Sequence, residues 1–432
     1  MAMPQILMGG ASVMEFLQGL QEQHMSELAF LLAQRQRQLH DARVEWPDVE
    51  LLEVRVLRHA EAMCVGGDVA LACAREALAS DAFDELAAGS YVRVLLGPGE
   101  EGIEEVLARI ASLDVALLSH CAQPLMLAPH PRMSSRLEDL LPSSGPSLRA
   151  FAARVMGLRR DGDAESLLPL LDDNEPDVRA SAALAVSKLG YRPALPVFER
   201  KLAQAPAGEM HVWALAALRV GSSRALQVCR QACRALGTPP PRLTWLLGLA
   251  GDAQDFGVVR TLCGRAETLV EGLDALGLLG VPEAVPLLLE HVGHGAPEVK
   301  SAAAAALVLM TGAELTETVE LPTEGAGEGG EVESALRVRT CTDSSAWRVW
   351  WEAHRPRLDG LSRMRLGQPF HLSVCLQELA HPRTSLAGRE RAGQELSIRS
   401  GQTVGFHPEW PVRYQRQAIE QWRQVRAVHA RR

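Results

Sequence analysis

The sequence has few aromatic residues, few lysines and no long apolar run. Aromatic residues make up 4% of the 432 residues, and its three lysines are Lys188, Lys201 and Lys300. No Lys or Arg precedes Arg35, so a secretory signal peptide would lack its basic region. No apolar stretch reaches the roughly 18 residues that a membrane span needs. We therefore expect a cytoplasmic protein that does not insert into membranes.

Recognisable signatures of catalysis and cofactor binding are also missing. The only candidate phosphate loop, Gly97-Pro98-Gly99-Glu100, lacks the sequence context of a P-loop or a dinucleotide fingerprint. The eight cysteines are scattered along the chain and are typical of reduced, packed thiols. Cys229 and Cys233 lie one turn apart on an expected helix, but no further zinc ligand follows at a recognisable spacing. We expect no catalytic residue, no metal and no cofactor.

The composition instead favours helices. Hydrophobic residues make up 47% of the chain, and alanine and leucine dominate them. These two residues lose little conformational freedom in a helix, whereas the β-branched residues that favour strands are comparatively few. The sequence therefore predicts an all-α protein.

Glycines recur at a regular interval in the middle of the chain. Each of them follows an apolar stretch, and they are Gly190, Gly221, Gly251, Gly280 and Gly312. Their spacing is about 30 residues throughout, a period typical of helical repeats. Glycine at the end of a helix suits a left-handed C-cap. The pattern therefore predicts a helix before each glycine.

A second set of residues repeats in the same register. Val197, Val228, Val258 and Leu287 follow successive glycines at the same interval, which predicts a second helix in each unit. The segments Pro176–Arg179 and Pro297–Lys300 both open alanine-rich helices and lie four repeats apart. Proline and an acidic residue both suit the first turn of a helix.

These patterns predict an α-solenoid of short repeats, because a helical hairpin must bury its apolar face against its neighbours. We expect a helical N-terminal domain over residues 1–145 and the repeat array over 146–312. A flexible acidic Gly/Glu loop is expected over 313–336, and a helical, Arg/Trp-rich cap over 337–432. Trp347, Trp350 and Trp351 are expected to pack into that cap.

The C-terminal region is basic, with 17 Arg against 8 Asp and Glu from residue 337 onward. Clustered arginines can bind nucleic-acid phosphates. The interspersed acidic residues favour pairing within the chain instead, so nucleic-acid binding is the weaker alternative.

The segment Ser166–Gly190 resembles the short HEAT-like repeats of many bacterial proteins, and the pattern recurs near 282–310. The flanking stretches Glu27–Arg37, Leu51–Gly66, Trp347–Trp351, Arg363–Gly367 and Gly388–Leu396 resemble an uncharacterised bacterial HEAT-repeat family that is often encoded near type VI secretion genes. The resemblance implies a partner among secretion-system components or effectors. HEAT-like enzymes with iron or bilin chemistry remain an alternative, although the His-Glu dipeptides with which the iron enzymes bind metal do not occur here.

The leading functional hypothesis is a non-catalytic scaffold, adaptor or chaperone that binds a protein partner along the array. An immunity or regulatory protein that binds a cognate effector would use the same fold. We expect the partner to contact the second helix of each unit, because the inner helices of a curved stack usually form the extended binding face. The predicted contact residues are Arg200, Arg230, Arg260 and Glu290.

Overall fold

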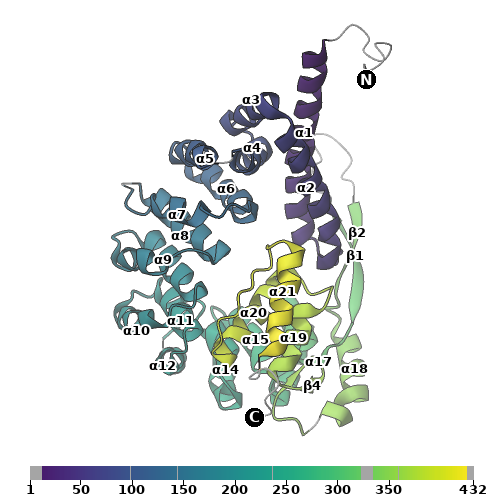
Figure 1. Cartoon of the computed structure of the whole chain (residues 1–432). Helices are drawn as coiled ribbons and strands as arrows, with labels where there is room; N and C mark the ends of the chain where they lie inside the picture. Colours follow the sequence, from purple (N-terminus) through teal and green to yellow (C-terminus); the bar gives the residue numbers. More distant parts are fainter. Residues whose placement is uncertain are drawn as a thin grey trace. The chain divides into compact units, whose positions relative to one another are not determined.

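The computed structural model describes residues 12–97, 99–143, 145–235, 237–322, 334–358 and 360–425, and it is mainly helical (Figure 1). Its residues form two compact units. Among the described residues, the first unit contains 12–194, 376–397 and 402–425, and the second contains 195–375 and 398–401. The C-terminal part of the chain therefore contributes to both units.

The first unit contains the N-terminal helices and the first repeats. Its elements are α1 (Val13–His40), η2 (Trp46–Val49), α2 (Glu50–Val65), α3 (Gly67–Ala79), α4 (Phe83–Leu95), α5 (Glu101–Ala111), α6 (Val115–Leu127), α7 (Met133–Glu138), α8 (Pro146–Arg159), η3 (Glu165–Asp172), α9 (Pro176–Lys188), η4 (Arg192–Ala194) and α21 (Val412–Gln424), with most of α20 (Leu386–Ser400) and the end of α19 (Leu372–Ala380).

Proline and small residues explain the local structure of α8 and α9. Both helices begin at a proline, whose missing N–H costs nothing at the first helical position. Gly157 of α8 lies so close to Ala185 of α9 that a Cβ at position 157 would be 2.7 Å from the Ala185 Cα. The two backbones therefore pack at a distance that only small side chains permit.

The second unit continues the repeats. Its elements are α10 (Leu195–Gln204), α11 (Met210–Arg219), α12 (Ser223–Arg234), α13 (Leu243–Ala250), η5 (Ala253–Asp255), α14 (Phe256–Leu262), α15 (Leu269–Leu279), η6 (Pro282–Ala284), α16 (Val285–His294), α17 (Pro297–Thr311), β1 (Thr316–Pro322), β2 (Ser334–Thr340), α18 (Ser344–Leu358), β3 (Met364–Arg365) and β4 (Gln368–Pro369), with the start of α19 and the end of α20.

The repeats of the second unit form two layers. In the first layer, α11, α13, α15 and α17 pack successively against one another. In the second layer, α10, α12, α14 and α16 pack against the helices of the first. Small residues meet along the first layer, Gly248 against Ala275 and Gly277 against Ala306. The prediction of an all-α solenoid is therefore confirmed.

The repeating glycines mostly occupy the predicted left-handed position. Gly190, Gly221, Gly280 and Gly312 have φ values of 74°, 99°, 66° and 68°. Gly251 is the exception, because its φ is −76°. Glycine is needed there for space instead, since a Cβ would lie 2.4 Å from the Leu247 carbonyl oxygen and 2.5 Å from Asp255 Oδ2.

The expected acidic loop over 313–336 is only partly a loop. Strands β1 and β2 pair in antiparallel register, with Glu317 opposite Arg339, and the two side chains form an ion pair of 2.8 Å. Cross-strand charge pairs and β-branched residues such as Thr318 and Val319 favour strands. The loop prediction relied on the number of glutamates and glycines and did not take these residues into account. The stretch 323–333 lies outside the described residues.

The C-terminal region from residue 337 onward is divided between the two units. Helix α18 packs against α16, and Trp347 and Trp351 are buried as expected, with the Trp347 indole donating to the Cys341 carbonyl oxygen at 2.7 Å. The segments that follow α18 belong partly to one unit and partly to the other, and the boundary between the units falls after Ala194, inside the expected array. Short-range sequence patterns do not show which distant helices the C-terminal segments contact. None of the described helices has both the length and the apolar character to cross a bilayer.

Candidate partner-binding surface

The outward face of the second layer carries charged residues at matching positions. Arg200 of α10, Arg260 of α14 and Glu290 of α16 are exposed. We call these three residues the exposed row. They lie one or two repeat lengths apart, so the same helical position is exposed on three of the four second helices of this unit. This surface suits contacts with a partner that extends along the layer.

Arg230 of α12, the fourth predicted contact, lies elsewhere. Its guanidinium pairs with Asp255 at 2.8 Å and with Asp252 at 3.0 Å, and only 15% of the side chain is exposed. Asp255 is buried, with 1% of its side chain exposed. These hydrogen bonds raise the pKa of Arg230, first through Asp255. Arg230 therefore joins α12 to the next repeat instead of facing solvent with the exposed row.

Other cations on α12 do face solvent. The helix buries Ala225, Cys229 and Cys233, which leaves Arg224 and Arg234 exposed. The buried residues are spaced at i, i+4 and i+8, the periodicity of one helical face. This spacing can be read from the sequence, and it would have predicted Arg224 and Arg234 as the exposed cations of α12 in place of Arg230.

The two cysteines of α12 are packed thiols. Burial raises the pKa of Cys229 to about 12 and that of Cys233 to about 11, so both are protonated at neutral pH. A protonated thiol is a poor nucleophile and a poor metal ligand. Among the described residues, no group of three His, Cys, Asp or Glu side chains is placed to hold a metal ion.

A cavity of about 520 Å³ also lies in the second unit, where α11, α12 and α13 meet the C-terminal segments. Its arginines have structural partners: Arg363 Nε donates to the Leu279 carbonyl oxygen at 2.7 Å and Arg399 Nη2 to that of Gly248 at 3.5 Å. Both guanidinium groups also lie over the Phe370 ring, at 4.0 and 5.1 Å. Because cations stabilise the negative ends of helices, these arginines hold the C-terminal segments against α13 and α15.

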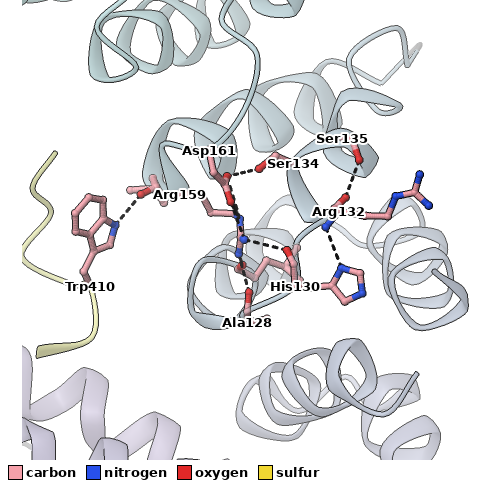
Figure 2. A network of polar contacts seen from close by, with 10 residues as sticks. Ala128, His130, Arg132, Ser134, Ser135, Arg159, Asp161 and Trp410 are labelled. Carbon is pink, nitrogen blue, oxygen red and sulfur yellow. Dashed lines mark hydrogen bonds and ion pairs between the residues drawn. The ribbon is translucent and has the colours of Figure 1, made fainter. Parts of the chain in front are cut away.

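In the first unit, too, an arginine binds the carbonyl oxygens at the end of a helix (Figure 2). Arg159, at the end of α8, donates to the carbonyl oxygens of Leu125 and Ala128 at 2.7 and 2.8 Å and pairs with Asp161 at 2.8 Å. Ser134 also hydrogen-bonds Asp161. The Trp410 indole donates to the Leu158 carbonyl oxygen at 2.7 Å. Arg159 and Trp410 thus join the ends of α6 and α8 to the C-terminal segment.

Comparison with known proteins identifies the repeats. Residues 134–219 match the sequence profile of HEAT repeats. No curated protein matches the sequence. The solved structure of human deoxyhypusine hydroxylase in complex with glycerol is similar at 16% identity and a TM-score of 0.25, over 58% of this chain and 95% of that chain. An engineered protein is similar at 15% identity and a TM-score of 0.29, over 90% of this chain and 99% of that chain. Neither likeness bears on activity.

Proposed function

We propose that this protein is a non-catalytic scaffold that binds a protein partner along the outward face of its second layer. The observation that carries the proposal is the exposed row, in which the repeat presents Arg200, Arg260 and Glu290 at one position of its second helices. Arg224 and Arg234 add positive charge on α12, between α10 and α14 in the chain. A partner with acidic groups opposite the arginines and a basic group opposite Glu290 would complement this face.

An adaptor or chaperone role in type VI secretion is the specific form of this proposal that the sequence resemblance favours. The partner would then be a secretion-system component or an effector. An immunity protein would instead form a tight one-to-one complex with its effector. The stoichiometry of the captured complex, measured by native mass spectrometry, separates these two roles.

Affinity capture with variants of the exposed row tests the proposal. The triple variant Arg200→Glu, Arg260→Glu and Glu290→Arg should lose the partner that the unaltered protein retains from its native lysate, because charged contacts along the surface are reversed. Arg348→Glu is the matched control, since Arg348 is exposed on α18 in the same unit but lies outside the second layer. Equal partner recovery by all three proteins would refute this surface.

A further inference from the structure

Arg160 departs from the repeat at a position that glycine otherwise occupies. It lies one repeat length before Gly190 and is the C-cap of α8, with φ 57° and ψ 32°. Gly190, Gly221, Gly280 and Gly312 also have positive φ values, which cost glycine little and cost a residue with a Cβ more. A residue with a side chain in this conformation warrants a functional explanation.

The side chain at position 160 is matched by a missing side chain on the facing segment. A Cβ added to Gly405 would lie 3.0 Å from Arg160 Nε and 3.1 Å from the Trp410 ring. The arrangement is reversed at Gly190, where a Cβ would lie 2.7 Å from Thr403. The C-terminal segment of the first unit is therefore shaped to leave room for the arginine.

The Arg160 guanidinium is poorly compensated. Nη2 donates to the Thr403 carbonyl oxygen at 3.0 Å, and within the part of the chain that the structure describes no carboxylate pairs with the side chain. Burial lowers the pKa of Arg160 to about 10. Arg159 next to it differs, because Arg159 has Asp161 as a counter-ion (Figure 2). The Arg160 side chain is half-buried and makes a single hydrogen bond to the described residues, so its guanidinium has N–H donors to offer to a ligand.

Arg160 lines a cavity of about 420 Å³ within the first unit. Leu127, Trp410 and Tyr414 give this cavity an apolar and aromatic wall, and two glutamines of α21 add amide groups. Asp161 also lines the cavity, where its charge is paired with Arg159. We call it the Arg160 cavity. Its volume is in the range of sites that accept a small ligand or a few side chains. A planar guanidinium beside an apolar wall suits a carboxylate carried on an apolar body.

We propose that the Arg160 cavity receives a carboxylate from a partner polypeptide, that of an Asp or Glu side chain next to an apolar residue. The proposal rests on the scaffold function proposed above and adds a specific contact to it. It involves the first unit alone, whereas the exposed row belongs to the second. Peptide binding and partner capture can therefore fail independently.

The probe is an acetylated and amidated Leu-Glu-Leu peptide, titrated into the full chain labelled with ¹⁵N at its tryptophan indoles. The eight tryptophans of the chain give few signals, and a Trp410→Phe variant assigns the one from the cavity wall. We expect the Glu peptide to shift the Trp410 signal. The Leu-Gln-Leu analogue should bind with roughly ten times lower affinity, because a neutral hydrogen bond replaces one between two charged groups.

Arg160→Gly separates binding from folding. This variant has the glycine that the repeat carries elsewhere, so we expect an unchanged or higher melting temperature together with loss of the peptide response. Arg154→Gln is the matched control, since Arg154 is exposed on the same helix and its removal changes the net charge equally. It should bind the Glu peptide as the unaltered protein does.

Several outcomes would overturn the proposal. A lower melting temperature for Arg160→Gly would make Arg160 a structural residue. Equal responses to the Glu and Gln peptides, or no response to either, would show that the Arg160 cavity does not recognise a carboxylate. A response to inorganic phosphate as strong as the response to the Glu peptide would indicate a general anion site instead of a peptide site.

Discussion

The two helical layers of the second unit differ in how their surfaces are used. First-layer helices such as α15 are buried almost throughout and meet their neighbours through small residues, as Gly277 meets Ala306. Second-layer helices such as α12 bury one face and expose the other. Stacked hairpins gain stability from nearest-neighbour burial, so the first layer determines whether the repeats stack. The second layer keeps an exposed face, the surface that we propose for partner binding.

The same substitution in the two layers should have opposite effects, and this is the largest effect we predict. Gly277→Leu in α15 should destabilise the second unit by about 3 kcal/mol, because even a Cβ there would lie 2.8 Å from Ala306. Gly257→Leu in α14 should be neutral or stabilising, because no atom lies within 4 Å of a Cβ placed at position 257 and leucine has a higher helix propensity than glycine. Urea unfolding of both variants measures the difference. Equal losses would contradict the division into layers.

Within the second layer, Arg230 and Arg260 should behave differently. Arg230→Met leaves the buried Asp255 without its counter-ion and should cost about 3 kcal/mol of unfolding free energy. Arg260→Met should change it by less than about 0.5 kcal/mol, because Arg260 is exposed. Adding Asp255→Asn should recover much of the Arg230→Met loss, and a double-mutant cycle measures this coupling. Additive effects would show that the ion pair is not the cause.

The stability of the first unit should depend on pH, because it contains an ion pair, whereas contacts between small apolar residues do not titrate. Hydrogen bonds from Arg93 and then Arg75 lower the pKa of Glu105 to about 2. A carboxylate with a depressed pKa stabilises the fold above its unfolded-state pKa, and that stability is lost as pH falls from about 4.5 to about 2. Since 33% of the Glu105 side chain is exposed, the loss should be about 1 kcal/mol after solvent screening.

The matched variant for this prediction is Glu105→Gln. It should be less stable than the unaltered chain at neutral pH, and its unfolding free energy should change less between pH 5 and pH 2. Urea titrations monitored by circular dichroism at the two pH values make the comparison. An unchanged pH dependence would assign the acid sensitivity to other carboxylates.

The sequence predicts the layers better than it predicts the contacts that close them. The spacing of Gly190, Gly221, Gly280 and Gly312 locates four helix ends, because a C-cap depends on local conformation. Extending the same interval to position 160 would also have revealed that an arginine replaces the glycine. The pairing of Arg230 with Asp255 could not be read this way, since it depends on side-chain geometry between repeats. The same holds for Arg363, which binds the carbonyl oxygen of Leu279 at the end of α15 although the two residues are far apart in the sequence.

The smallest predicted effect concerns the turn that joins the two layers. Gly221 lies between α11 and α12 with φ 99° and no atom within 4 Å of its would-be Cβ, so an added side chain meets backbone strain alone. Gly221→Ala should therefore cost about 1 kcal/mol, and Gly221→Asn should cost less because asparagine tolerates positive φ. Thermal unfolding ranks the three proteins. If alanine and asparagine lower the melting temperature equally, backbone conformation is not the reason for the glycine at position 221, and the contrast with Gly277, where the neighbouring helix leaves no room, would have to be explained in another way.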